Sequence, residues 1–219
     1  GGCPAFNANT IVIIESCIDA TVSNSGNVCE GTPTFDLFAT YTETVGAPTT
    51  YEWKDNDGNV VSTNQDPIDV PVPVDAGTYV YTLVITQNGS ASEVYSTTLI
   101  VYELPVATFS SSDTTICTNA TTTLVISGVA GSTVNLTDGT NNYPVPIGTD
   151  GTGTFTTPAL TVNTTYTIVD AESDTNPICT YTVVSGTPNT VVTISVGLPT
   201  ATIVGFVNSV ICSETGTGL

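Results

Sequence analysis

Threonine alternates with valine, isoleucine and tyrosine along much of this chain, in runs about as long as β-strands. The run 161–169 is the clearest example. β-Branched side chains lose χ1 freedom in a helix and pack well on a half-buried pleated surface. The pattern therefore predicts an all-β protein.

Four strands are predicted in the first half of the chain, at 34–41, 50–54, 77–85 and 93–102. Between the second and third of them, the segment 55–59 contains an Asp-Gly pair. Glycine supplies the positive φ that a tight hairpin needs, so this segment predicts a chain reversal.

Three aromatic residues are predicted to anchor the cores of immunoglobulin-like sandwiches. Trp53 lies where such domains carry a core tryptophan, and Tyr79 lies where a tyrosine corner is expected, after a turn that contains Asp and Gly. Tyr166 is expected to take the position of Tyr79 in the second half of the chain.

A segment made of a predicted strand, a short linker and a cysteine occurs three times, and it ends at Cys29, Cys117 and Cys212. The spacing of these cysteines is close to the length of one small all-β module of about 100 residues. The repeat predicts tandem immunoglobulin-like β-sandwich modules in a rod-like array. The expected divisions are the end of a preceding module at 1–15, complete modules at 16–103 and 104–197, and the start of a following module at 198–219.

The links between modules are short, with Leu-Pro at 104–105 and again at 198–199. Proline fixes its own φ and leaves few free dihedrals in so short a link. We therefore expect successive modules to form a semi-rigid rod.

The formal net charge is -19, with a single Lys or Arg against 20 Asp and Glu. Contacts with phosphate need cations, so nucleic acid and anionic membranes are not expected as partners. No segment is apolar over the length of a membrane span, so no membrane insertion is predicted within this sequence.

The six cysteines lack CxxC spacing, and the chain has no His and no Met. This composition disfavours zinc, haem and copper sites and favours disulfides in an oxidising, extracytoplasmic setting. The predicted bonds are Cys17–Cys29 and Cys117–Cys179, with Cys3 and Cys212 each bonded to a neighbouring module.

The recurring Leu-Pro and Ile-Cys segments, together with Val-Asn-Thr-Thr-Tyr-Thr-Ile at 162–168, resemble the immunoglobulin-like and polycystic-kidney-disease-type repeats of very large Bacteroidota surface adhesins. Gliding-motility adhesins secreted by the type IX system are among these proteins. The resemblance implies secretion, a long cell-surface fibre and attachment to surfaces or polysaccharide. The first module departs from the repeat, because it lacks a counterpart of Cys179 and carries the additional Cys17.

The acidic segment 55–59 has a second interpretation as a fragment of a calcium loop, since oxygen ligands suit a hard cation. Calcium at module junctions, bound by Glu15, Asp19 or Glu103, is an independent possibility. The plain hairpin turn and solvated acidic rims are the favoured interpretations, and no cofactor or metal site is assigned.

No catalytic residues are predicted. Glu52 and Asp36 are a candidate carboxylate pair, but no His or Arg accompanies them. Lys54 is a candidate for an intramolecular isopeptide bond. Strand alternation places it in solvent if the adjacent Trp53 faces the core.

Glycan chemistry offers two sets of candidates. Thr114 lies in an Asp-Thr-Thr motif of the kind that carries O-glycans in the bacterial group named above, and Asn-x-Ser/Thr sequences begin at Asn88, Asn119, Asn135 and Asn163. Four tyrosines are candidates for stacking on sugars, although strand tyrosines ordinarily pack across strands: Tyr41, Tyr51, Tyr95 and Tyr143.

The leading functional hypothesis is a disulfide-stabilised structural and adhesive segment of a long extracellular fibre. Its partners would be neighbouring modules or subunits of the same fibre and surface polysaccharide. One alternative is a filament subunit assembled by strand donation between 198–219 of one chain and 1–15 of the next. The other is a spacer or carbohydrate-binding module of a secreted enzyme.

Overall fold

The computed structural model describes residues 18–42, 49–112, 114–184, 186–187 and 189–197, and the regular structure in them is entirely β-strand. The chain divides into two compact units, Gly1–Glu103 and Leu104–Leu219. The predicted all-β class is confirmed. The terminal segments 1–15 and 198–219, predicted to belong to neighbouring modules, lie outside the described residues.

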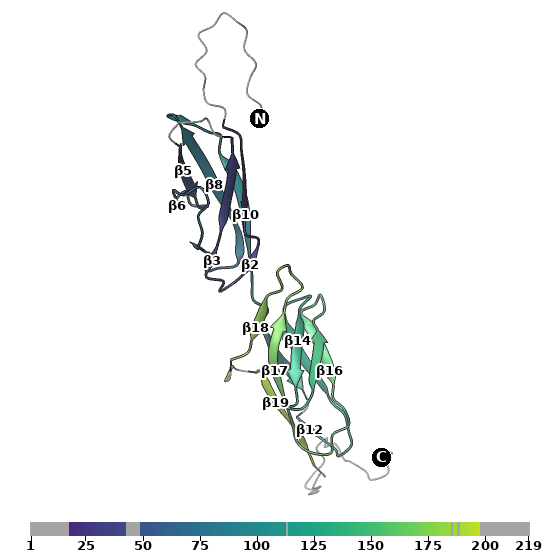
Figure 1. Cartoon of the computed structure of the whole chain (residues 1–219). Helices are drawn as coiled ribbons and strands as arrows, with labels where there is room; N and C mark the ends of the chain where they lie inside the picture. Colours follow the sequence, from purple (N-terminus) through teal and green to yellow (C-terminus); the bar gives the residue numbers. More distant parts are fainter. Residues whose placement is uncertain (1–17, 43–48, 113, 185, 188, 198–219) are drawn as a thin grey trace, which may run out of the picture. The chain divides into compact units, whose positions relative to one another are not determined.

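The first unit is a sandwich of antiparallel and parallel strands (Figure 1). One layer has the strand order β2-β10-β8-β5-β6, with β9 paired to β8, and the other contains the pairs β1-β4 and β3-β7. The bounds of these strands are β1 (Ala20–Asn24), β2 (Val28–Cys29), β3 (Thr34–Phe35), β4 (Leu37–Tyr41), β5 (Thr49–Lys54), β6 (Val60–Ser62), β7 (Val70–Pro71), β8 (Gly77–Gln87), β9 (Ser90–Ala91) and β10 (Tyr95–Tyr102).

The second unit repeats this arrangement. One layer has the order β12-β19-β17-β14-β15, with β18 paired to β17, and the other has the order β11-β13-β16. The bounds are β11 (Ala107–Ser112), β12 (Thr115–Ile116), β13 (Thr123–Gly128), β14 (Thr133–Thr137), β15 (Asn142–Pro146), β16 (Thr152–Thr156), β17 (Thr164–Glu172), β18 (Thr180–Thr182) and β19 (Val191–Val196).

Strict alternation along the longest strand builds the first core. In β8, Tyr81, Leu83 and Ile85 are buried, whereas the residues between them are partly exposed. Successive strand side chains point to opposite faces, so a period of two places every second residue between the layers. Residues of both layers join in one apolar cluster that includes Phe35, Leu37 and Trp53.

Two of the predicted anchors belong to the first unit. Trp53 is fully buried, and its indole N–H donates a hydrogen bond to the Gln65 carbonyl oxygen at 3.1 Å. The Tyr79 hydroxyl donates to the Asp75 carbonyl oxygen at 2.8 Å. A tyrosine bonded to the backbone a few residues upstream is the geometry of a tyrosine corner.

Tyr166 differs from the sequence-based prediction. In the register of the paired strands, Thr164 of β17 matches Tyr79, and Tyr166 matches the buried Tyr81. Tyr166 therefore lies in the core of the second unit, where it is fully buried. Its hydroxyl has no hydrogen-bond partner, and a buried polar group without a partner costs stability.

Replacing Tyr166 with Phe is expected to raise the free energy of unfolding of the second unit by about 1 kcal/mol, because it removes an unpartnered buried hydroxyl and keeps the ring. Chemical denaturation at neutral pH measures this change. Tyr79→Phe is the matched control and is expected to lower stability, because it removes a hydroxyl that is bonded. A destabilised Tyr166→Phe variant would contradict this description of the core.

Candidate functional site

In each unit a short parallel strand pair lies where the chain leaves the unit. In the first, Val28 lies opposite Val101 and Cys29 opposite Tyr102, and the Glu30 N–H donates to the Tyr102 carbonyl oxygen at 2.8 Å. In the second, β12 pairs in the same way with the end of β19. We call these the exit pairs, β2 with β10 and β12 with β19.

The chain enters and leaves each unit at opposite ends of its last long strand. Ile18 lies beside the start of β10, since its carbonyl oxygen accepts the Tyr95 hydroxyl at 2.7 Å, and the chain leaves after Tyr102 at the other end. In the second unit, the N–H of Phe109 donates to the carbonyl oxygen of Asn189, just before β19 begins. Entry and exit therefore lie at opposite ends of each unit.

The described cysteines are Cys29, Cys117 and Cys179, and each is disulfide-bonded. Cys29 and Cys117 follow the same pattern, because each belongs to or directly follows the short strand of an exit pair. Cys179 is fully buried, and its N–H donates to the Ser173 hydroxyl at 2.8 Å.

The structure does not bring Cys117 and Cys179 together, contrary to the sequence-based prediction. Cys117 lies near the residues that precede β17, because the N–H of Asn119 donates to the Leu160 carbonyl oxygen. Cys179 lies beyond the other end of β17, next to Ser173. At about 3.3 Å per residue the strand separates them by about 30 Å, whereas a disulfide needs Cα atoms about 6 Å apart.

The remaining predicted bonds involve residues outside the described part of the chain. Cys3, Cys17 and Cys212 all lie there. The Cys17–Cys29 bond and the links of Cys3 and Cys212 to neighbouring modules remain predictions.

The acidic segment 55–59 forms the β5–β6 hairpin. One Asp55 carboxylate oxygen accepts the backbone N–H groups of Asp57 at 3.0 Å and Asn59 at 2.8 Å, and Gly58 supplies a φ of +85°. These bonds, led by that from the Asn59 side chain, hold the pKa of Asp55 below its ordinary value. The carboxylate is therefore ionised at neutral pH.

Within the described residues, no group of three or more His, Cys, Asp or Glu side chains is placed to hold a metal ion. Asp19 and Glu103 are both exposed, and Glu15 lies outside the described residues. Calcium binding at the module junctions remains a prediction.

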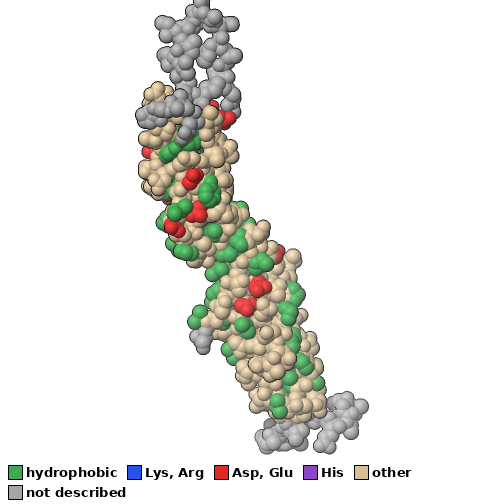
Figure 2. Space-filling model, in the orientation of Figure 1, with side chains coloured by type: hydrophobic (Ala, Val, Ile, Leu, Met, Phe, Trp, Pro, Cys, Tyr) green, Lys and Arg blue, Asp and Glu red, His purple; other side chains and the backbone are tan. Residues whose placement is uncertain are grey.

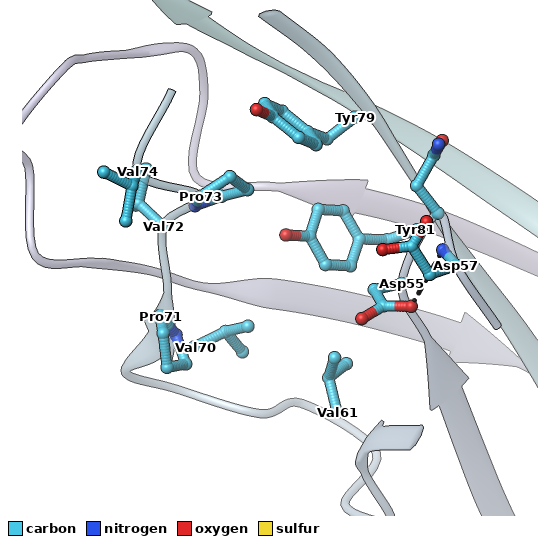
Figure 3. Close-up of a pocket in the computed structure, with 11 residues that line it drawn as sticks. Asp55, Asp57, Val61, Val70, Pro71, Val72, Pro73, Val74, Tyr79 and Tyr81 are labelled. Carbon is cyan, nitrogen blue, oxygen red and sulfur yellow. Dashed lines mark hydrogen bonds between the residues drawn. The ribbon is translucent and has the colours of Figure 1, made fainter. Parts of the chain in front are cut away.

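A cavity of about 400 Å³ opens beside this hairpin (Figure 3). Its apolar wall comes from β7 and the residues after it, 70–74, together with Val61 of β6. Its polar side comes from the hairpin residues 55–57 and from Tyr79 and Tyr81 of β8. We call this the acidic pocket.

Tyr81 lies at the back of the acidic pocket. The residue is only 3% exposed, and its hydroxyl points into the cavity (Figure 3). This hydroxyl has no hydrogen bond among the described residues, whereas the neighbouring Tyr79 donates its own to Asp75. Burial, and then the nearby Asp55 and Tyr79, raise the pKa of Tyr81.

The matching place in the second unit is filled by aromatic rings. Tyr166 packs against Phe155 at a centroid distance of 5.6 Å and against Tyr143 at 6.1 Å. The Tyr143 hydroxyl donates to the Asp138 carboxylate at 2.8 Å, across the β14–β15 hairpin. These rings close over the Tyr166 hydroxyl, where the first unit has an opening lined by valine and proline.

The candidate carboxylate pair is not assembled. Glu52 lies on β5 and forms an ion pair with Lys54 at 2.5 Å. Asp36 belongs to the other layer, between β3 and β4, where it accepts the N–H of Asp69 at 3.1 Å. Lys54 is likewise committed to Glu52 at the surface.

The candidate glycan sites are distributed over several elements. Thr114 is exposed and directly precedes β12, while Asp113 of its motif lies outside the described residues. Asn135 donates to Asp170 at 2.6 Å, and the Asn163 side chain accepts the N–H of Val196 at 2.7 Å. Asn88 and Asn119 lie in turns with positive φ. Glycosylation at these residues remains a prediction.

The four tyrosines considered for sugar stacking are half-buried and bonded rather than exposed. The hydroxyls of Tyr41 and Tyr51 bond each other, and the rings meet edge to face. Tyr95 and Tyr143 have the partners already described. Cross-strand packing is therefore the role the structure gives them.

Acidic side chains lie among hydrophobic ones on the visible face of the first unit (Figure 2). This matches a chain with 20 acidic residues and one basic residue. The described part of the chain contains no helix that is long and apolar enough to cross a membrane.

Comparisons with known proteins support the fold. No family model and no curated protein matches the sequence. Among solved structures, a marsupial T cell receptor matches with a TM-score of 0.50 at 11% identity, over 82% of this chain and 73% of that chain. At this identity the similarity concerns the fold alone, which is that of tandem immunoglobulin-like sandwiches.

Two further solved structures match at lower TM-scores. A three-immunoglobulin fragment of titin, an E-to-A mutated variant, has a TM-score of 0.47 at 13% identity, over 82% of this chain and 64% of the fragment. A 1.5-MDa bacterial ice-binding adhesin has a TM-score of 0.42 at 15% identity, over 84% of this chain and 66% of that chain.

The burial of Tyr166 predicts that the stability of the second unit depends on pH in the alkaline range. Burial first, and then Tyr143 and Asp138, raise the pKa of Tyr166 from 10.0 to about 12. The folded state then favours the protonated phenol. The contribution of Tyr166 protonation to the free energy of unfolding is therefore complete below pH 10.0 and is lost as the pH rises to about 12. Over this pH range the free energy of unfolding should fall by about 3 kcal/mol more for wild type than for Tyr166→Phe.

Denaturant unfolding of both proteins at a series of alkaline pH values measures the difference. Tyrosinate absorbance, recorded in parallel, follows ionisation directly. Equal pH dependence of the two proteins would contradict a sealed Tyr166.

Proposed function

We propose that this chain is a structural and adhesive repeat segment of a long extracellular surface fibre, with no catalytic role. The observation that carries the proposal is the placement of entry and exit at opposite ends of each unit, with a parallel exit pair at the point of departure. A unit of this construction transmits tension from its predecessor to its successor.

The exit pairs supply the mechanical resistance. The short strand and the last long strand run in the same direction, so tension between the ends of a unit slides one past the other. Bonds between parallel strands are evenly spaced along the pair, and sliding loads them together. The whole set must then break in one step, which takes more force than breaking the bonds one by one.

The cysteines and the charge support an extracellular setting. Disulfide-bonded cysteines persist in oxidising compartments. The excess of 19 negative charges keeps such chains apart in solution. The single basic residue also leaves trypsin-like proteases almost no cleavage site.

The finer assignment is a surface adhesin of the Bacteroidota type, exported by type IX secretion and acting in attachment or gliding. Its basis is the resemblance of the recurring Leu-Pro and Ile-Cys phrases to repeats of those adhesins. Neighbouring modules of the same fibre are the expected partners. A polysaccharide ligand would have to be recognised at a surface other than the four packed tyrosines.

The proposal predicts disulfides that join successive modules. Cys117 lies at the exit end of the second unit, and the register keeps it away from Cys179. Peptic digestion without reduction, followed by mass spectrometry, should yield linked peptides whose two cysteines belong to different modules. A dominant peptide linking Cys117 to Cys179 would contradict both the register and this prediction.

The proposal also predicts that one backbone bond contributes to mechanical strength. Glu30→Pro removes the N–H that bonds the Tyr102 carbonyl oxygen, and it should lower the force at which the first unit unfolds. Single-molecule pulling through the two chain ends measures this force. Glu30→Ala is the matched control, because it keeps the backbone bond and removes only the side-chain contact to the Ala76 N–H.

Equal unfolding forces for the two variants would show that the exit pair does not bear the load. The second unit in the same molecule serves as an internal reference, because its exit pair is unchanged.

A further inference from the structure

The acidic pocket has the size and the mixed lining of a ligand site. Its volume of about 400 Å³ lies within the range of small-ligand sites, which runs from about 300 to about 1,000 Å³. One side is aliphatic and the other is polar (Figure 3). Aromatic rings close the corresponding place in the second unit, around the fully buried Tyr166.

The side chain of a buried tyrosine points into this cavity (Figure 3). Tyr81 is 3% exposed, and its hydroxyl has no hydrogen bond among the described residues. In the second unit the equivalent hydroxyl, that of Tyr166, is sealed in the core and has no partner. In the first unit the hydroxyl faces an opening from which a ligand can reach it.

The polar groups of the acidic pocket are mostly hydrogen-bond acceptors. Asp55 and Asp57 contribute carboxylates. Tyr79 uses its proton on the Asp75 carbonyl and keeps its oxygen lone pairs. A ligand that fits this set donates hydrogen bonds and carries positive charge.

The opposite wall selects for an apolar stem. Val70, Val72 and Pro73 present aliphatic surface across from the two phenol groups (Figure 3). A methylene chain packs on such a wall while its charged end stays at the polar side. Phenol rings near the charge add a favourable cation–π contribution.

We infer that the acidic pocket binds the side chain of a lysine presented by a partner protein. The ammonium group donates to the Asp57 carboxylate and to the Tyr81 hydroxyl oxygen, and the four methylenes lie along the wall formed by Val70 and Val72. The chain's own Lys54 is held by Glu52. The inference concerns a partner of the first unit and stands independently of the load-bearing role.

Lysine suits this arrangement better than arginine or a sugar. An ammonium group directs three donors to separate acceptors, whereas a guanidinium fork needs a free carboxylate edge. Asp55 offers no such edge, because both of its oxygens accept bonds from Asn59. Only Asp57 is left for a fork, whereas an ammonium group divides its donors between Asp57 and Tyr81. A neutral sugar could bond the Asp57 carboxylate, but without the charge assistance that an ammonium group brings.

The test is a titration of the isotope-labelled full chain followed by NMR. The probes are the lysine derivative Nα-acetyl-lysine-N-methylamide, the same compound acetylated at Nε, and a neutral disaccharide. Lysine amide should produce saturable shifts at Tyr81, Val70 and Val72, and the Nε-acetylated compound should lose them. Tyr166 in the closed second unit should not respond.

Matched variants separate a specific site from general attraction. Asp57→Asn should weaken binding about tenfold, because it removes a charge-assisted bond. Asp75→Asn removes the same charge from the same unit at a side chain that does not line the cavity, and it should change affinity little. Tyr81→Phe should weaken binding about fivefold.

Three outcomes would overturn the inference. They are shifts that spread over the acidic surface without saturating, equal effects of Asp57→Asn and Asp75→Asn, and a response to the disaccharide in place of the lysine derivative. Amide spectra of each variant establish that the unit remains folded, and the titration of wild type needs no variant at all. None of these outcomes bears on the pulling experiment, so the two proposals fail separately.

Discussion

The parallel pairing of a short strand with the end of the last long strand is the constraint on which the rest of each unit depends. In the first unit it places Val28 against Val101 and Cys29 against Tyr102. In the second it places Ile116 against Val196. Because the pair lies at the point of departure, it fixes where the chain leaves, and the last long strand then fixes how far the exit lies from the entry. Under the proposed function, a series of such units transmits force through strand pairs loaded in shear.

The two units share this framework and differ in how they treat one buried tyrosine. In the second, Phe155 and Tyr143 seal Tyr166, so the hydroxyl lies in the core without a partner. In the first, residues smaller than these rings leave Tyr81 facing a cavity rimmed by carboxylates. Repeats that must carry load need the same strand pairing, whereas the lining beside one hairpin is free to vary. That freedom allows a binding function to arise in one repeat without weakening the array.

Alternation of β-branched and polar residues was enough to predict the all-β class, and the Asp-Gly pair located the β5–β6 hairpin. Both are local signals, because side-chain direction and turn geometry depend on adjacent residues. The disulfide pairing and the position of Tyr166 depend on register, which local patterns do not contain. Cys117 and Cys179 each lie close to a strand in sequence, yet β17 separates them along its whole length. The acidic pocket was missed for the same reason, since its residues come from separate parts of the sequence, 55–57, 61, 70–74, 79 and 81.

The most direct measurement of the central claim compares two directions of pulling on the first unit. In one, the handles are at the two chain ends; in the other, they are at Thr32 and Glu103, which lie at the same end of the exit pair. The account predicts a clearly higher unfolding force through the chain ends, because sliding loads all bonds of the pair together and the second geometry opens them one after another. Equal forces in the two directions, or a higher force for the second, would contradict a load-bearing exit pair.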